Sequence, residues 1–287
     1  THDHRRVFDE SVATFCIMSA DRACKQPTFC GNKTLAIIDT VDMDLRQGPR
    51  CAALWNCDKN QEGRVSDRIV RIIGSDAVLK PRKRECSRIS VPGISRSCEP
   101  ASRGTKTTKT LRMSGSWNSK DHGMATRWGF TKWRIDLRNA CVRHHSECKW
   151  KYQTLAGGRA FDALELYVKS RFCFMPPGDT IVRQAITDAI SLGCIPVFFH
   201  PKQMELWPRF WNASNASLLF NITRGPSAID DMFKTLLEFD NEREEMLRSE
   251  LMRVAHQVMF TSRRSPNALD ILLSSISETA TSRSLLS

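Results

Sequence analysis

The residues best placed for chemistry follow a short apolar run at residues 172–175. A Pro-Pro-Gly bend at residues 176–178 ends that run, because proline cannot donate to a strand ladder and glycine frees the backbone. The next segment is helical in pattern, and Arg183 and Asp188 lie on its polar face. A cation and backbone N–H groups at a helix start favour an anion. The spacing therefore suits a diphosphate followed by a pair of sugar hydroxyls; the alternative is that both charges are solvated surface groups.

The elements that must position these residues form a predicted β-α-β unit. Residues 172–175 and 195–199 are apolar runs of strand length, and the residues between them have an apolar helical face at positions 182, 185, 186, 189 and 190. We expect Asp179 or Thr180 to cap this helix and Gly193 to end it. The bend is neither a Walker A loop nor Gly-x-Gly-x-x-Gly, so those motif rules do not apply.

This unit carries a resemblance to a known family. The run Phe-Cys-Phe-Met-Pro-Pro-Gly-Asp-Thr at 172–180 is followed by Arg183, Asp188 and Gly-Cys-Ile-Pro-Val-Phe-Phe-His-Pro at 193–201. Together they closely resemble the exostosin-like glycosyltransferases, above all the plant and algal branch that includes xyloglucan galactosyltransferases. The resemblance implies an α/β fold of GT-B type. It also implies a nucleotide-sugar donor and no metal.

The resemblance also implies roles for individual residues. Relatives place an arginine seven residues before a cysteine, and Arg134 stands at that spacing from Cys141. A guanidinium suits donor phosphates because its planar fork binds two oxygens at once. We therefore expect the donor to be bound by phosphate contacts from Arg134, Arg183 and the amides of Gly178, Asp179 and Thr180, by ribose contacts from Asp188, and by sugar or base contacts from His200.

The acceptor side is less defined. Asp3-His4 resembles the Asp-His motif at the end of an N-domain strand in the family. His4 and Asp9 are therefore candidates for the catalytic base, and an exposed terminal histidine is the alternative. The predicted activity is transfer of a sugar, with galactose suggested by the branch, from a UDP-sugar to a glycan or glycoprotein acceptor, with inversion and without a metal. The alternative function is non-catalytic binding of a glycan or polyanion on a degenerate transferase scaffold.

The pattern predicts two parts. Residues 1–105 are expected to form a partial, loop-rich N-terminal domain on the acceptor side, and residues 106–287 a Rossmann-like, nucleotide-sugar-binding C-terminal domain with a parallel sheet. Strands are predicted at 35–38, 69–73, 89–91 and 110–114, with a loop at 115–123. Helices are predicted at 132–144, 161–169, 227–238, 241–260 and 266–276. In the fourth helix we expect Met246 to be buried and Glu244 to be a surface charge.

The aromatic residues Trp207, Phe210 and Trp211 follow the second strand of the β-α-β unit. Loops beyond the strand ends of a parallel sheet line its ligand crevice. These side chains could therefore stack on an acceptor sugar or a base, and core packing is the alternative.

Charge and composition limit the partners. The net charge of +12 suggests an anionic partner. Much of the excess lies in residues 80–112, which contain no aromatic residue and no nucleic-acid-binding signature, so we expect a solvated basic loop and no nucleic-acid partner. No stretch is long and apolar enough to span a membrane.

Cysteines and sequons indicate the compartment. Eleven cysteines are many for a reduced protein, and Cys141 and Cys148 could form a loop-closing disulfide. N-glycosylation sequons begin at Asn32, Asn212, Asn215 and Asn221. Together these features favour a secretory lumen, and the resemblance implies the Golgi. Because the chain begins at Thr1, we expect a piece of a type II membrane protein whose anchor lies elsewhere.

Overall fold

The chain forms two compact units, residues 1–91 with 270–287 and residues 92–269. The computed structural model describes residues 15–19, 34–39, 69–73, 87–90, 92, 109–117, 129–152, 160–178, 181–260 and 264–284. The expected domain boundary between residues 105 and 106 falls outside these ranges, so it stays a prediction.

The first unit contains a four-stranded parallel sheet in the order β1-β2-β3-β4. The strands are β1 (Phe15–Ser19), β2 (Thr34–Asp39), β3 (Ile69–Ile73) and β4 (Ser87–Ser90). Strands β2, β3 and β4 were predicted from their apolar runs and are confirmed. Each observed end lies within two residues of the predicted end. Strand β1 was not predicted, because its sequence Phe-Cys-Ile-Met-Ser has no turn signal beside it.

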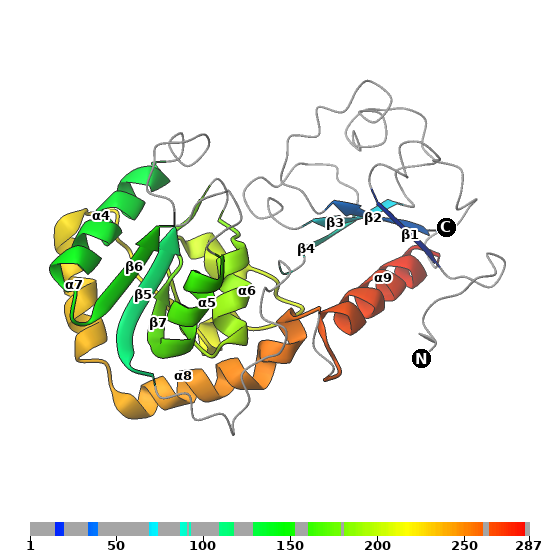
Figure 1. Cartoon of the computed structure of the whole chain (residues 1–287). Helices are drawn as coiled ribbons and strands as arrows, with labels where there is room; N and C mark the ends of the chain where they lie inside the picture. The colour runs from blue at the N-terminus through cyan, green and yellow to red at the C-terminus, as the bar shows by residue number, and fades with distance from the viewer. Residues whose placement is uncertain are drawn as a thin grey trace. The chain divides into compact units, whose positions relative to one another are not determined.

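The second unit is built on a five-stranded, all-parallel sheet (Figure 1) in the order β6-β5-β7-β8-β9. The strands are β5 (Leu111–Trp117), β6 (Cys148–Tyr152), β7 (Ser170–Phe174), β8 (Ile195–Phe198) and β9 (Leu218–Leu219). The chain enters at β5, runs to the edge strand β6, and returns past β5 to β7. The direction of sheet growth therefore reverses between β5 and β7.

Helices cover both faces of this sheet. Figure 1 shows α4 (Phe130–Arg143) and α7 (Pro226–Leu237) on one side and α5 (Ala160–Lys169) and α6 (Gln184–Ser191) on the other. This two-sided cover explains why residues 172–174 of the central strand β7 are apolar and fully buried. The parallel α/β architecture expected from the sequence is confirmed in this unit.

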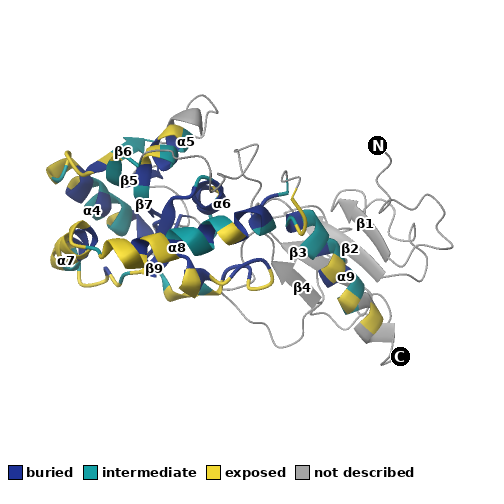
Figure 2. Ribbon diagram, turned by 90° about the horizontal axis from the view of Figure 1, so that it is seen from below, coloured by how far each residue is buried: buried dark blue, intermediate teal, exposed yellow. Residues whose placement is uncertain are grey.

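Helix α6 is the most enclosed of these helices (Figure 2), because α5, α8 (Asn241–Val254) and the 3-10 turn η5 (Ala255–Val258) pack around it. Thr187, Asp188 and Ser191 on its polar face are fully buried. The hydroxyls of Thr187 and Ser191 donate to the backbone oxygens of Gln184 and Asp188, both at 2.8 Å. Local hydrogen bonds therefore make this polar face compatible with burial.

The start of α6 differs from the prediction. Its N-cap is Arg183, whose backbone is extended (φ −142°, ψ 140°), so a cap at Asp179 or Thr180 is wrong. The physical reason is that Ile181 is fully buried, which holds the chain in an irregular path until Arg183. The predicted end is confirmed, because Gly193 follows the helix with φ 65°.

The C-terminal helices carry two further corrections. Met246 on α8 is 67% exposed, whereas Glu244 is 4% exposed, the reverse of the prediction for both. The buried face of α8 consists of Glu244, Leu247, Leu251 and Val254, so a charged residue occupies a core position. The last helix, α9 (Ala268–Ser284), begins after a cis peptide bond between Ser265 and Pro266.

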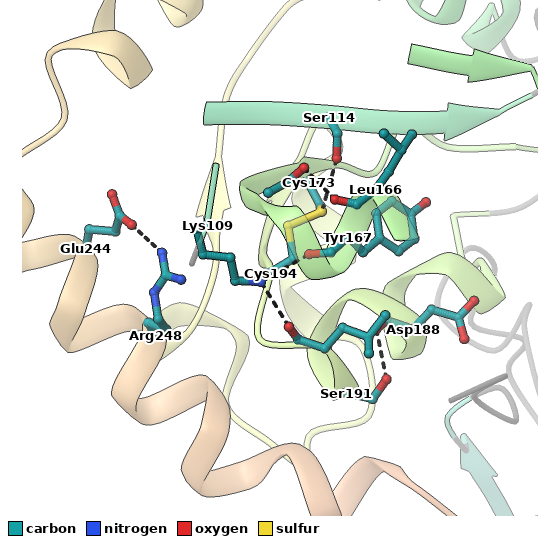
Figure 3. The surroundings of a disulfide bond; sticks show 12 residues. Lys109, Ser114, Leu166, Tyr167, Cys173, Asp188, Ser191, Cys194, Glu244 and Arg248 are labelled. Atoms are coloured by element: carbon teal, nitrogen blue, oxygen red, sulfur yellow. Dashed lines mark hydrogen bonds and ion pairs between the residues drawn. A yellow bond between two sulfur atoms is a disulfide. The ribbon is translucent and has the colours of Figure 1, made fainter. Parts of the chain in front are cut away.

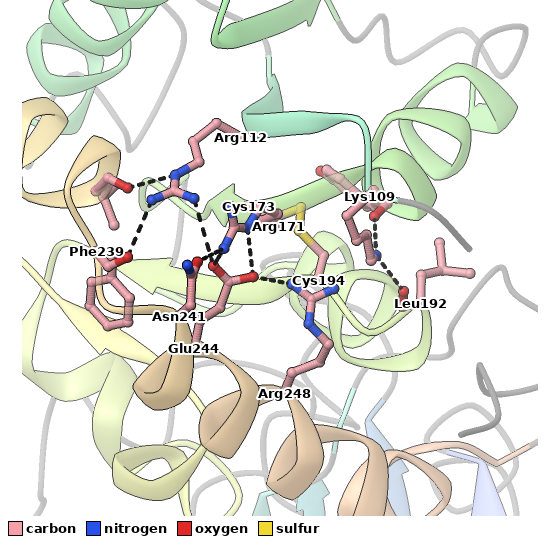
Figure 4. A network of polar contacts seen from close by, with 12 residues as sticks. Lys109, Arg112, Arg171, Cys173, Leu192, Cys194, Phe239, Asn241, Glu244 and Arg248 are labelled. Carbon is pink, nitrogen blue, oxygen red and sulfur yellow. Dashed lines mark hydrogen bonds and ion pairs between the residues drawn. A yellow bond between two sulfur atoms is a disulfide. The ribbon is translucent and has the colours of Figure 1, made fainter. Parts of the chain in front are cut away.

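Glu244 is buried because arginines surround it at the amino edge of the second sheet (Figure 4). Arg171, at the start of β7, donates through Nε to Glu244 Oε1 at 2.7 Å, and Arg248 pairs with the same oxygen from the next turn of α8. Arg112 lies 3.9 Å from Glu244 Oε2. A buried carboxylate requires such partners, since an unpaired one would lose its hydration without compensation.

Cations at the same edge also bind the ends of the helices. Arg112 donates to the backbone oxygens of Leu236 and Leu237 at the end of α7, both at 2.8 Å. Lys109 Nζ donates to Tyr167 O at 3.1 Å and Leu192 O at 3.0 Å, at the ends of α5 and α6. These positive charges are thus paired with the negative ends of helix dipoles.

Two disulfides tie strands to neighbouring segments of the second unit. Cys141 on α4 is bonded to Cys148 at the start of β6, with a sequence separation of seven residues. Cys173 on β7 is bonded to Cys194, 21 residues later. Figure 3 shows this second bridge next to Ser114 of β5 and Lys109. The pairing of Cys173 with Cys194 was not predicted, since sequence spacing does not determine connectivity.

We predict that Lys109 makes stability depend on pH. Burial and the nearby Arg248 lower the pKa of Lys109 from 10.5 to about 7, so between these values the unfolded chain binds more protons. The free energy of unfolding should therefore rise as pH increases from 7 towards 10. In Lys109→Met this slope should fall, by up to about 1.4 kcal/mol per pH unit. Urea unfolding at several pH values measures the slope.

The matched control for this prediction is Lys169→Met, which removes an exposed lysine paired with Glu165. Its slope should equal that of the unmodified chain. Loss of hydrogen bonds in Lys109→Met lowers stability at every pH, which is why slopes and not absolute values are compared. Equal slopes for the unmodified chain and Lys109→Met would contradict the prediction.

Candidate functional site

The candidate site lies at the carboxyl ends of β5 and β7. The strand order reverses between these two strands, and in open α/β sheets ligands bind in the crevice outside the carboxyl ends at such a switch point. The helices that follow the two strands are α4 and α6. Both therefore begin at this edge and direct their N-terminal dipoles towards it.

Strand β5 reaches this edge three residues further than predicted, through Trp117. The residues expected in a loop, Gly115 to Trp117, pair with β6 and β7 instead. Gly115 is needed there, because a Cβ at this position would lie 1.9 Å from the ring of Trp117. The Trp117 Nε1–H donates to Arg134 O at 3.0 Å. The end of β5 therefore fixes the turn of α4 that carries Arg134.

Arg134 and Gly178 are in direct contact. A Cβ added to Gly178 would lie 2.7 Å from Arg134 Nη2 and 3.7 Å from its Cζ. The Arg134 guanidinium thus occupies the space that a side chain at position 178 would need. Glycine at position 178 allows the guanidinium to approach the backbone closely, because the Cβ of any other residue would displace it.

Arg183 reaches the same place from α6. Its Nη1 donates to Pro176 O at 3.2 Å, and its Nη2 donates to Ser116 O at 3.0 Å. Its Cδ lies 3.9 Å from the position of a Cβ on Gly178. The side chain therefore runs along the bend and across to the end of β5. Two arginine side chains from different helices therefore converge on Gly178.

The electrostatics of this edge favour an anion. Arg183 is the N-cap of α6 but makes no side-chain cap, and the first turn of α6 contains no acidic residue. The helix dipole adds partial positive charge to that of the two guanidiniums. A phosphate oxygen is the type of group that such an arrangement binds.

His200 lies at the end of β8, at the same edge of the sheet. Its ring is 5.9 Å from that of Phe130, the first residue of α4, in an edge-on contact. His200 Nδ1 accepts a hydrogen bond from Lys202 N at 3.2 Å, so the neutral ring carries its proton on Nε2. Burial, and then the charge of Lys202, lower the pKa of His200. At neutral pH the ring therefore offers an Nε2–H donor.

Gln203 was missed by the sequence analysis. It is fully buried in the 3-10 helix η3 (Pro201–Glu205), where it forms a reciprocal capping box with His200. A signal was present, because proline one residue after a potential cap and glutamine three residues after it mark a helix start. The signal was overlooked because His200 is an unusual cap residue.

Asp188 is not at this edge. It lies in the middle of α6 and its side chain is 0% exposed, and Figure 3 shows its carboxylate pointing away from Ser191 and the disulfide. The expected ribose contact needs an accessible carboxylate, so the geometry gives it no support. Asp179, Thr180, His4, Asp9 and Asn32 lie outside the described residues, and the predictions for them stay predictions.

The aromatic residues after β8 belong to the core. Trp207, Phe210 and Trp211 are all less than 5% exposed, and Trp211 donates through Nε1 to Leu206 O at 3.0 Å. Of the two roles that the sequence left open, core packing is the one observed. The three sequon residues of this region, Asn212, Asn215 and Asn221, are exposed.

Within the ranges that the structure describes, no group of three or more His, Cys, Asp or Glu side chains could hold a metal ion. Of the described residues that meet at Gly178, the charged ones are Arg134 and Arg183, and cations repel a metal ion. The site is therefore suited to a ligand that itself carries negative charge.

Comparison with known proteins gives one family match. Residues 95–219 match the family described as Exostosin GT47 domain. This range includes β5 to β9 and with them Arg134, Gly178, Arg183 and His200.

Curated relatives come from Arabidopsis thaliana. The chain is 30% identical over 104 residues to "Probable xyloglucan galactosyltransferase GT15", covering 34% of this chain and 21% of that protein. It is 38% identical over 69 residues to "Xyloglucan-specific galacturonosyltransferase 1", covering 24% of this chain and 10% of that protein. It is 45% identical over 38 residues to "Xyloglucan galactosyltransferase MUR3", covering 13% of this chain and 6% of that protein. The chain thus spans about a fifth or less of the length of these relatives.

Solved structures are more distant. The pneumococcal O-GlcNAc transferase GtfA, in complex with UDP and GlcNAc, has a TM-score of 0.44 and 12% identity, over 91% of this chain and 54% of that one. Sucrose-phosphate synthase from Thermosynechococcus elongatus has a TM-score of 0.49 and 9% identity, over 91% and 72%.

We predict that Gly178→Ala weakens binding of UDP by about tenfold, because the new methyl group displaces the Arg134 guanidinium. The melting temperature should change little, since the clashing atom is the end of a flexible side chain. Isothermal titration calorimetry with UDP and a thermal melt measure the two effects. UDP affinity equal to that of the unmodified chain would show that the position of Arg134 does not matter for binding.

Proposed function

Because residues 95–219 form an exostosin GT47 domain and the chain is a distant homologue of plant xyloglucan galactosyltransferases, we propose that it contains the donor-binding domain of a glycosyltransferase. The proposed reaction moves a sugar from a UDP-sugar to a glycan or glycoprotein acceptor. The branch of the family favours galactose as the sugar. We further propose a GT-B arrangement, in which the first unit belongs to the acceptor side.

The observation that carries the proposal is the convergence of Arg134 and Arg183 on Gly178 at the switch point of the second sheet. A switch point is where a doubly wound sheet binds its ligand. Arginine is suited to phosphate because one planar group donates to two oxygens. The same place would therefore hold the diphosphate of a nucleotide sugar.

The proposed chemistry is stabilisation of the leaving group. When the bond from the sugar to the diphosphate breaks, negative charge grows on the departing UDP. Arg134, Arg183 and the positive end of α6 balance that charge, with the amides of residues 178–180 as further donors. In this proposal the charge is balanced without a metal ion, and the acceptor attacks from the side opposite to the diphosphate, which gives inversion.

The remaining contacts are assigned by position. His200, with its Nε2–H donor and its contact to Phe130, is proposed to meet the sugar or the base. Asp188 is left out of the proposed donor contacts because it is fully buried. A base for the acceptor hydroxyl would come from the first unit, where His4 and Asp9 are the candidates.

Several features support a secretory location, which for this family we propose to be the Golgi. All four cysteines between residues 109 and 284 are in disulfides, as is typical of proteins folded in an oxidising compartment. Three sequon asparagines are exposed. Among the described residues, no helix has the length and hydrophobicity needed to cross a bilayer.

We predict that Arg134→Ala and Arg183→Ala each weaken UDP binding by about ten- to a hundredfold, the range expected when a hydrogen-bonded charge pair is lost. Titration calorimetry with UDP, UDP-galactose and UMP measures the effect. UMP lacks the second phosphate, so its weaker binding should change less than that of UDP in both variants.

The matched control is Arg143→Ala, on the same helix as Arg134. Arg143 pairs with Asp230 at 2.7 Å, and both side chains are about half exposed, so this variant should bind UDP as the unmodified chain does. Equal losses in all three variants would indicate a general charge effect. Binding of glycans without any binding of UDP or UDP-sugars would favour the non-catalytic alternative.

A further inference from the structure

One side chain connects the two loops that bear the candidate site. Gln203 Oε1 accepts hydrogen bonds from Phe199 N at 3.0 Å and His200 N at 3.1 Å. Its Nε2 donates to Met175 O at 2.9 Å and Ile181 O at 3.2 Å. A primary amide has two donor hydrogens and two acceptor lone pairs on its oxygen. Every one of them is used, and the side chain is fully buried.

The partners of Gln203 lie on both sides of the functional groups. Met175 and Ile181 lie before and after the bend that contains Gly178, so the amide group fixes the two ends of the bend relative to each other. Phe199 and His200 lead out of β8, so their hydrogen bonds fix the direction in which His200 leaves the sheet. Gln203 therefore sets the separation between the bend after β7 and the loop after β8.

The positions of the Arg134 and Arg183 guanidiniums depend on the bend that Gln203 holds. Arg134 Nη2 lies 2.7 Å from the position that a Cβ on Gly178 would occupy. Arg183 donates to Pro176 O, inside the bend that Gln203 holds. A shift of the bend by a few tenths of an ångström would therefore change the position of both guanidiniums relative to a bound diphosphate.

We propose that Gln203 is a positioning residue for donor binding, which acts by holding the bend at Gly178 and the His200 loop in register. The proposal rests on the proposed function, because it concerns the same UDP-sugar site. Gln203 itself does not touch the donor. Its effect is on the placement of Gly178, Arg183 and His200.

The first test compares Gln203→Met and Gln203→Glu. Methionine has a similar length but forms none of the four hydrogen bonds, and an ionised glutamate directs an oxygen at two carbonyl oxygens. Both variants should bind UDP at least about tenfold more weakly than the unmodified chain at pH 8. Titration calorimetry at 25 °C gives the affinities, and a thermal melt shows whether each variant is folded.

The second test uses pH as a rescue. A protonated glutamate can accept from both amides and donate to one carbonyl, which restores three of the four hydrogen bonds, and burial raises the pKa of a carboxyl group. The affinity of Gln203→Glu relative to the unmodified chain should therefore recover at about pH 6, whereas that of Gln203→Met should not. The ratio is compared because nearby charged groups, namely His200, Lys202, Glu205 and Arg183, affect both chains.

Ser170→Ala is the control for loss of a buried hydrogen bond. Ser170 lies at the opposite end of β7, and its hydroxyl donates to Leu166 O at 2.7 Å. This variant should lose thermal stability without losing UDP affinity. If Gln203→Met also keeps UDP affinity within about twofold of the unmodified chain, or if Gln203→Glu does not recover at low pH, the proposal is wrong.

Failure of the proposed function is distinguished by a measurement that needs no ligand. Amide hydrogen exchange at Phe199 and His200 should be faster in Gln203→Met than in Ser170→Ala, because the acceptor of those two amides is lost. Absence of UDP binding by the unmodified chain would refute the proposed function. Unchanged exchange in Gln203→Met would refute the positioning role instead.

Discussion

Parallel pairing of the five strands in the second unit is the constraint on which the other features depend. It brings the N-terminal ends of the following helices to one edge of the sheet and the C-terminal ends to the other. At the amino edge, Lys109 and Arg112 bind the carbonyl groups that end α5, α6 and α7. At the carboxyl edge, Arg134 and Arg183 lie beside helix starts. Lys109 and Arg112 offset the negative ends of helix dipoles, whereas Arg183 adds its positive charge to the positive end of the α6 dipole.

The two edges also differ in the hydrogen-bond partners that position their arginines. Glu244 lies between Arg171 and Arg248 and compensates charge within the protein. At the other edge, Arg183 donates to the backbone carbonyls of Pro176 and Ser116, and these hydrogen bonds orient its guanidinium. The same residue type is thus structural at one end of β7 and suited to ligand binding at the other end.

The sequence predicted the parts whose signals are local. The bend at residues 176–178, the strands beside it and the end of α6 at Gly193 follow from proline, glycine and apolar spacing, and the segment that carried the family resemblance lies within the matched range of residues 95–219. Features that depend on distant residues were not predictable. Glu244 is buried because Arg171 on β7 and Arg248 on the next turn of α8 pair with it, whereas Met246 lies on the exposed face of the same helix. Gln203 bonds to Met175 and Ile181, which are more than twenty residues away in sequence.

The bridge between Cys173 and Cys194 closes a covalent ring that contains the bend, Arg183 and the whole of α6. Unfolding cannot disperse these groups beyond the span of that ring, so the entropy lost when they assemble is smaller than in an open chain. Material made in a reducing host would lack this restraint. Recombinant production of the chain therefore calls for a periplasmic or secretory route.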